Sequence, residues 1–117
     1  MDTLLVTIEG CIDDAQPGFV ECVLADAEGR VHRFVEKAPV VSLANLGPGS
    51  AYPQPGSIGC VVEAAWIDEQ GRQRARVSTE RPWDIASVTG ETRFSVFREQ
   101  LVQTADPSER AGGKDGV

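Results

Sequence analysis

Apolar and polar residues alternate along most of this chain with a period of two, the spacing that is typical of half-buried β-strands. Residues 4–9 place Leu4, Val6 and Ile8 on one face, and residues 19–24 repeat the alternation. We expect further strands over residues 30–37, 57–68, 72–80 and 92–97, with a weaker one near residues 85–88. The pattern therefore predicts an all-β domain, a small six- or seven-stranded antiparallel barrel or sandwich built from consecutive hairpins.

Two segments with the pattern Asp-x-x-Gly-Arg lie between predicted strands. Residues 26–30 and 68–72 both suit a three-residue hairpin loop in which the glycine takes a positive φ. The partners expected from these turns are Leu24 and His32, Cys22 and Phe34, Val20 and Glu36, and Trp66 and Arg74. In the first hairpin, the face that carries these pairs is expected to be the core.

The two hairpins also resemble each other upstream of their turns. Residues 16–24 and 54–62 both begin with Gln-Pro-Gly and both contain a Cys-Val pair, at Cys22 and Cys60. Two interpretations stay open. In the first, the hairpin unit is internally duplicated, which would give the two cysteines equivalent core positions. In the second, the similarity arises by chance, because few residue types suit hairpin turns.

A long uncharged segment joins the two hairpins. Residues 38–62 contain no charged side chain, and their middle part, residues 47–56, is rich in glycine and proline with one tyrosine, Tyr52. Proline fixes φ, so this connection is expected to be semi-rigid. It is either a functional loop or a plug that carries the chain across one end of the barrel.

Residues 92–103 allow two assignments. Polar and apolar residues first alternate behind a turn signal, whereas Phe94, Phe97 and Leu101 also match the spacing of a helix. We expect a strand that ends at Phe97, followed by a short C-terminal helical turn.

The chain of 117 residues fits one domain, and residues 1–103 are expected to form it. Residues 104–117 are polar and are predicted to be a flexible tail. No stretch approaches the roughly 18 apolar residues that cross a bilayer, and the first residues lack the basic region of a signal peptide. We therefore expect a cytoplasmic protein that does not interact with membranes.

The net charge of −7 is unevenly distributed. Every charge before Arg30 is negative, whereas arginines cluster at Arg72, Arg74, Arg76 and Arg81. Nucleic-acid binding depends on basic residues that neutralise phosphates, so this balance disfavours a nucleic-acid partner. It is compatible with a basic protein partner at the acidic N-terminal third, although acidity that serves only solubility is the simpler interpretation.

Cysteine and histidine usage argues against a metal site or a disulfide framework. The chain has three cysteines, an odd number with no Cys-x-x-Cys pair, and one histidine. The adjacent Asp13 and Asp14 suit a turn better than a cation site. We expect no metal and no cofactor.

The sequence offers few residues that could form a catalytic site. His32 is the one candidate imidazole base, and Asp26 and Glu36 are the carboxylates expected nearest to it. Cys22 is expected diagonally across from His32, where a structural cysteine beside a core histidine is the simpler interpretation than a Cys–His pair. The sequence contains no nucleophile elbow, phosphate-binding glycine loop or His-Glu-x-x-His motif. We name no catalytic residue, and the absence of these motifs from the sequence favours a protein that is not an enzyme.

The better binding candidates are tryptophans near arginines. Trp66 with Arg74 and Arg76 forms one candidate face, and Trp83 lies at a strand junction. Trp and Arg are enriched at the centres of protein interfaces, although either tryptophan would also fit a core position. These residues favour a non-enzymatic module for protein–protein interaction, a role that an inhibitor or immunity-type protein would have.

A second hypothesis places a small-molecule site, or a minor enzymatic site, at one end of the barrel. Tyr52, His32 and the 47–56 loop would line it.

Overall fold

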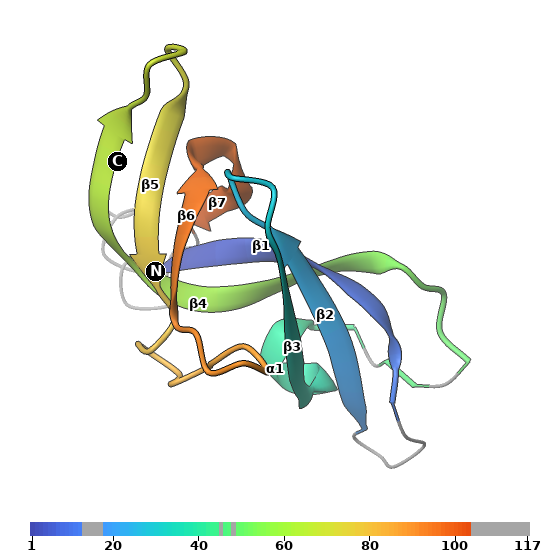
Figure 1. Cartoon of the computed structure of the whole chain (residues 1–117). Coiled ribbons are helices and arrows are strands. Elements are labelled where there is room, and N and C mark those ends of the chain that lie inside the picture. Colours follow the sequence, from blue (N-terminus) through green and yellow to red (C-terminus); the bar gives the residue numbers. More distant parts are fainter. Residues whose placement is uncertain (13–17, 45, 48, 104–117) are drawn as a thin grey trace, which may run out of the picture.

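The described part of the chain, residues 1–12, 18–44, 46–47 and 49–103 of a computed structural model, is mostly strand (Figure 1). The strands are β1 (Asp2–Cys11), β2 (Phe19–Ala25), β3 (Val31–Lys37), β4 (Gln54–Ile67), β5 (Gln73–Ser78), β6 (Arg93–Phe97) and β7 (Leu101–Gln103). A short helix, α1 (Ala38–Val41), follows β3, and a 3₁₀ turn, η1 (Arg98–Gln100), joins β6 to β7. The predicted strand to Phe97 and the helical turn after it are confirmed.

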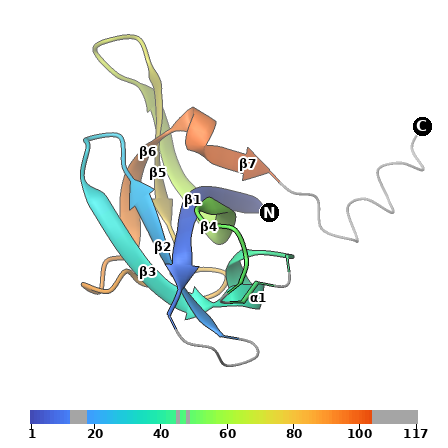
Figure 2. The same ribbon diagram turned by 90° about the vertical axis from the view of Figure 1, so that its right-hand side faces the viewer.

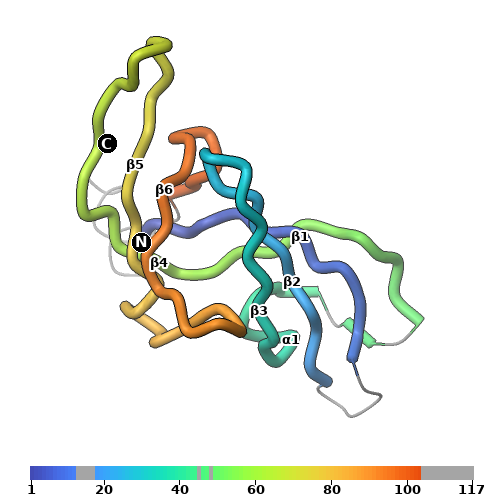
Figure 3. The backbone as a smooth tube through the Cα atoms, viewed as in Figure 1, coloured from blue at the N-terminus to red at the C-terminus, as the bar shows by residue number. Residues whose placement is uncertain are grey.

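All strands belong to one antiparallel sheet, in the order β3-β2-β1-β4-β5-β6, with β7 paired to β1. The sheet is curled into a half-barrel, as the backbone trace in Figure 3 shows. The tip of the β2–β3 hairpin contacts β6, the strand at the other end of this order. There the Ala27 N–H donates to the Ser95 carbonyl at 2.9 Å. The predicted all-β antiparallel fold of consecutive hairpins is therefore confirmed.

Alternating apolar residues of the strands fill the inside of this curl. The buried set includes Leu4, Ile8, Val20, Cys22, Leu24, Phe34, Ile58, Cys60, Ala75, Val77, Phe94 and Val96. Phe34 and Phe94 meet edge to face at 5.7 Å between ring centroids, so the β2–β3 hairpin packs directly against β6. The residues that alternate with a period of two therefore point into the core, as the sequence pattern predicts.

Both Asp-x-x-Gly-Arg turns adopt the predicted conformation. Gly29 and Gly71 have φ of 83° and 81°, a region that glycine enters without steric cost. In each turn one aspartate oxygen, on Asp26 or Asp68, accepts the N–H groups of the residues two and four positions later at 2.9–3.0 Å. The predicted pairs, Leu24 with His32, Cys22 with Phe34, Val20 with Glu36 and Trp66 with Arg74, are all observed.

The second hairpin differs from the first in how the strand before its turn is paired. Cys22 pairs with Phe34 within its own hairpin, whereas Cys60 pairs with Asp2 of β1. Both cysteines are buried in the core, but only Cys22 lies within the ladder of its own hairpin, so the two do not occupy equivalent ladder positions. The reason is the length of β4, whose first half pairs with β1 and whose second half pairs with β5 around a bulge between Val62 and Ala64.

Two local predictions need correction. Residues 85–88 form no strand, because the Ser87 and Val88 N–H groups donate to the carbonyls of Glu91 and Arg33 and so shape a turn against β3. The segment after Lys37 begins with one turn of helix rather than a loop.

Pro39 stands at the start of α1, where its missing N–H costs no hydrogen bond. The helix buries Ala38 and Val41 against the sheet. Of the 47–56 segment, residues 54–56 already belong to β4, and Tyr52 packs against the core. The predicted tail at 104–117 and the Asp13–Asp14 pair lie outside the described residues.

Candidate functional site

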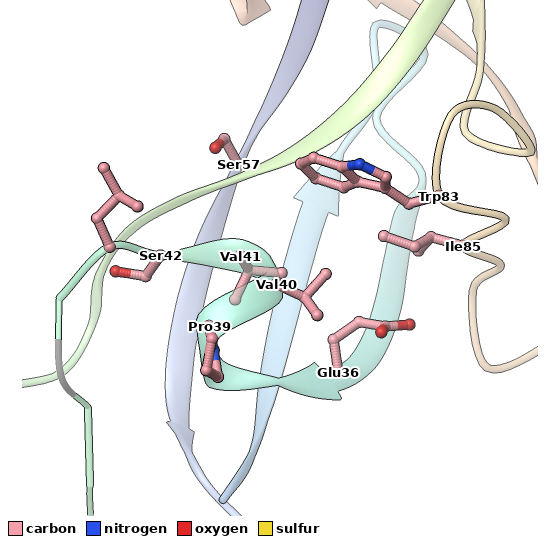
Figure 4. A pocket seen from close by; sticks show the side chains of 9 residues that line it. Glu36, Pro39, Val40, Val41, Ser42, Ser57, Trp83 and Ile85 are labelled. Atoms are coloured by element: carbon pink, nitrogen blue, oxygen red, sulfur yellow. The ribbon is translucent and has the colours of Figure 1, made fainter. Parts of the chain in front are cut away.

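An open groove of about 620 Å³ lies between the end of β3, α1, the first half of β4 and the turn before β6 (Figure 4). We call it the α1 groove; it is lined by Glu36, Pro39, Val40, Val41, Ser42, Leu43, Ser57, Trp83 and Ile85. Figure 4 shows Trp83, Val40 and Glu36 around the opening; Glu36 comes from β3, Val40 from α1 and Trp83 from the turn before β6. Eight of the nine residues come from two short stretches, 36–43 and 83–85, and the sequence pattern does not predict that these stretches lie together.

Two glycines of β4 bring the walls of the α1 groove close to the sheet. A Cβ on Gly56 would lie 3.0 Å from the Val41 carbonyl oxygen and 2.7 Å from Cδ1 of Ile8, so only glycine lets α1 approach here. A Cβ on Gly59 would lie 3.2 Å from Cδ2 of Trp83. The two glycines therefore set the positions of α1 on one side and of the indole on the other.

The turn that carries Trp83 is held by hydrogen bonds. The Thr79 hydroxyl donates to the Ile85 carbonyl at 2.6 Å, and the Ile85 N–H donates to the Thr79 carbonyl at 2.9 Å. Asp84 takes a φ of 54°, a left-handed conformation that aspartate tolerates better than most residues. The indole therefore projects from a fixed turn rather than from a loose loop.

Apolar side chains of the α1 groove are unusually open to solvent. Trp83 is 42% exposed, Val40 is 37% exposed and Leu43 extends fully into solvent, while Ile85 is buried beneath them. A cluster of exposed large apolar side chains around a concavity marks a binding site more often than scattered single residues do. Trp83 is thus a surface aromatic residue and not part of the core.

Glu36 is the one ionisable side chain among the residues that line the α1 groove. It is half-buried opposite Val20, and its burial raises the pKa of the carboxyl group above the ordinary value of 4.5. Within the described residues, no hydrogen bond or ion pair reaches this carboxylate. A desolvated carboxylate without a partner is complementary to a positively charged donor.

The predicted Trp66–Arg74 pair is present, but it belongs to a network within the protein. The Arg74 guanidinium lies 5.8 Å from the Trp66 ring and 5.5 Å from the Phe97 ring. It also forms ion pairs with Asp68 at 3.2 Å and Glu28 at 3.5 Å, and its side chain is only 14% exposed. We call these five residues the Arg74 cluster; they tie the β4–β5 hairpin to β6 and to the first turn.

His32 is buried between two carboxylates. Its Nε2 lies 2.8 Å from Oδ2 of Asp26, and its Nδ1 lies 2.8 Å from Oε1 of Glu91. The ring also meets Phe94 edge to face at 4.8 Å. Asp26 was predicted as a neighbour, but the second carboxylate is Glu91 and not Glu36, because Glu36 lies at the opposite end of β3.

Burial alone would raise the pKa of Asp26, but the hydrogen bond from His32 and those from the Arg30 and Glu28 N–H groups outweigh it and lower the pKa. Burial raises the pKa of the Cys22 thiol to about 12. A thiol with that pKa stays protonated at neutral pH, so Cys22 is a poor nucleophile. His32 and Cys22 are therefore best understood as core residues.

The other predicted binding residues are divided between two places. His32 and the exposed Arg76 line the same narrow polar cleft of about 160 Å³, together with Glu28 and Glu91. Tyr52 lies apart from this cleft and donates its hydroxyl to the Gly47 carbonyl at 2.8 Å. Neither His32 nor Tyr52 lines the α1 groove.

Several carboxylates of the acidic N-terminal third already have partners. Glu21 pairs with Arg33 at 3.3 Å, and Glu28 and Asp26 contact Arg74 and His32 as described. Less negative charge is thus available to an external basic partner than the sequence alone implies.

Among the described residues, no group of three or more His, Cys, Asp or Glu side chains is placed to hold a metal ion. The helices in that part of the chain fall short of the length and apolarity needed to cross a membrane. No protein-family model, no curated protein and no solved structure matches the chain.

Proposed function

We propose that this protein is a non-enzymatic binding module whose α1 groove holds a segment of a partner protein. The observation that carries the proposal is the combination of an exposed indole, Trp83, with the Glu36 carboxylate, which has no partner among the described residues, across the same concavity. Tryptophan in a concave, partly desolvated setting is the residue most enriched among side chains that dominate binding energy.

The chemistry of the α1 groove specifies the partner. Its apolar surface, from Trp83, Val40 and Leu43, suits one large aliphatic or aromatic side chain. Glu36 suits an adjacent lysine or arginine, because a cation beside it would offset the desolvation that raises its pKa. The net charge of −7 favours the approach of such a basic segment.

A small-molecule ligand is the second candidate, because a volume of about 620 Å³ lies within the usual range for ligand pockets. Its location differs from the one predicted from sequence, since Tyr52 and His32 are outside the α1 groove. The same chemistry would then select a small amphipathic amine.

Selection of random peptides displayed on phage against the immobilised full chain tests the proposal. We expect enriched peptides with a large apolar residue next to lysine or arginine. Trp83→Ala should weaken the best peptide at least about tenfold in a fluorescence-polarisation titration. Glu36→Gln should remove the preference for a basic residue.

Trp66→Ala is the matched control, because Trp66 is 39% exposed and lies outside the α1 groove. It should leave the affinity within about twofold of wild type. Equal losses with Trp66→Ala and Trp83→Ala would contradict the proposal. So would saturable binding of hexylamine at Trp83 with no peptide selected, which would support the small-molecule candidate instead.

A further inference from the structure

The segment that leads into β6 lies beside β3, although β3 and β6 are the two end strands of the sheet (Figures 1 and 2). We call residues 85–91 of this segment the latch turn. The Val88 N–H donates to the Arg33 carbonyl at 2.8 Å, and Nδ1 of His32 lies 2.8 Å from Oε1 of Glu91. These two contacts hold the latch turn against β3.

The latch turn is a hydrogen-bonded unit that continues into one wall of the α1 groove. The Ser87 N–H donates to the Glu91 carbonyl at 2.8 Å, and the Glu91 N–H donates to Oγ of Ser87 at 3.1 Å. Its first residue, Ile85, lines the α1 groove together with Trp83, whereas β3 contributes Glu36 to the opposite wall. Movement of the latch turn away from β3 would therefore separate the two walls.

The two carboxylates that contact the buried His32 ring differ in how firmly they are held. Oδ2 of Asp26 lies 2.8 Å from Nε2 of the ring, and Oδ1 accepts the Glu28 and Arg30 N–H groups at 2.9 Å. Because Asp26 is fixed in this way, a neutral imidazole keeps its proton on Nε2 and presents a lone pair at Nδ1. The charged ring carries a proton on both nitrogens and also attracts Glu91. The contact with Glu91 therefore depends on the charge of the ring, whereas the hydrogen bond to Asp26 is kept in both forms.

Six charged side chains line the polar cleft beside His32: Asp26, Glu28, Arg30, Arg76, Glu91 and Arg93. Arg93 is held by Glu63 at 3.2 Å, so it is committed to β4. Arg30 lies 3.5 Å from Oε2 of Glu91 and its side chain is 65% exposed. It offers Glu91 a partner in solvent when the His32 ring is neutral.

We propose that His32 is a pH-sensitive latch. In its charged form the ring holds the latch turn against β3 through Glu91, and in its neutral form it releases the turn, so that the α1 groove widens. Histidine is the side chain that most readily changes its charge near neutral pH. The latch is therefore closed while the ring is charged and opens as the pH rises. Regulation of partner binding by this latch rests on the function proposed above, whereas the latch itself does not.

NMR spectra of the isotopically labelled full chain, recorded from about pH 5 to pH 9, test the latch without any partner. Its failure and that of the proposed function are therefore distinguishable. His32 is the one histidine of the sequence, so its ring resonances report its own titration. We expect the Trp83 indole N–H and the Val88 amide resonances to shift with the same midpoint as the His32 ring, while the Trp66 indole resonance stays in place.

Glu91→Gln tests whether Glu91 transmits the effect. The substitution removes the charge that attracts the charged ring and keeps a polar side chain of the same size. The His32 ring should still titrate, but the Trp83 and Val88 resonances should no longer follow it.

Glu21→Gln is the matched control, because the Glu21 side chain is 40% exposed, as that of Glu91 is, but pairs with Arg33 at 3.3 Å. It should leave the shifts of Trp83 coupled to the ring. Glu36→Gln removes the ionisable side chain of the α1 groove and should also preserve the coupling, which excludes a direct effect of that carboxylate on the indole.

Three results would overturn the proposal. The first is a His32 ring that titrates while the Trp83 and Val88 resonances stay unchanged. The second is the same coupling in Glu91→Gln as in wild type. The third is a ring that keeps one charge state over the whole pH range.

Discussion

Trp83 packs against β4 at Gly59, where a Cβ atom would lie only 3.2 Å from Cδ2 of the indole. This contact fixes the angle at which the ring enters the α1 groove. Gly59, which has no side chain, thus determines the position of Trp83, the side chain that we propose to bind the partner.

Gly59→Ala should therefore displace the indole by a few tenths of an ångström and cost roughly 1–3 kcal/mol of stability. In a Trp66→Phe background, where Trp83 is the remaining tryptophan, the substitution should change the wavelength of maximum fluorescence emission. Gly10→Ala is the control, because no atom lies within 4 Å of a Cβ at that strand position. Identical emission spectra for the two variants would contradict this account of the contact.

The buried pair of Asp26 and His32 predicts a loss of stability in acid. The pKa of Asp26 is lower in the folded chain than its ordinary value of 3.8, so the folded state favours the carboxylate. Its contribution is fully present above the unfolded pKa and is lost as the pH falls through the folded one. Urea unfolding measured from about pH 7 to pH 2 should show this decline.

Asp26→Asn should lower the free energy of unfolding at pH 7 by about 2 kcal/mol and flatten its decline in acid, because it removes a charge-assisted hydrogen bond. The control, Asp68→Asn, changes the same position of the other turn, where the partner is Arg74. Its effect should be smaller, since Asp68 lies in the projecting hairpin. An Asp26→Asn variant with wild-type stability at pH 7 would exclude this role for the pair.

The Arg74 cluster predicts that an arginine is required at this position. Arg74→Lys keeps the charge but loses the guanidinium group that lies 5.8 Å from the Trp66 ring and 5.5 Å from the Phe97 ring, so the free energy of unfolding should fall by about 1 kcal/mol. Arg76→Lys, two residues along the same strand face, should change it by less than about 0.5 kcal/mol because Arg76 is exposed. Chemical denaturation of both variants provides the comparison; equal losses would contradict it.

The first hairpin could be predicted from sequence down to its individual pairs. Alternation decides which residues face the core, and the turn between Asp26 and Arg30 sets the register, so His32 and Phe34 fall opposite the correct partners. The contact between Asp26 and His32 follows from the same local information. Glu91 could not be assigned in this way, because it reaches His32 from a turn 59 residues further along the chain.

The α1 groove could not be predicted, for a physical reason. Gly56 and Gly59 shape it by having no side chain, which leaves no periodic signal in the sequence. The single turn of α1 is too short for helical periodicity to show. The sequence marks Trp83 as an aromatic residue at a strand junction, but only the fold places it across from Glu36.

The two indole N–H groups of the chain give the most direct test of the proposed binding site, because each tryptophan produces a separate resonance in a ¹H–¹⁵N correlation spectrum. Titration of the labelled full chain with the tightest selected peptide should shift or broaden the Trp83 resonance and leave that of Trp66 in place. A peptide that binds while the Trp83 resonance stays unchanged would contradict the assignment of the α1 groove as the partner site.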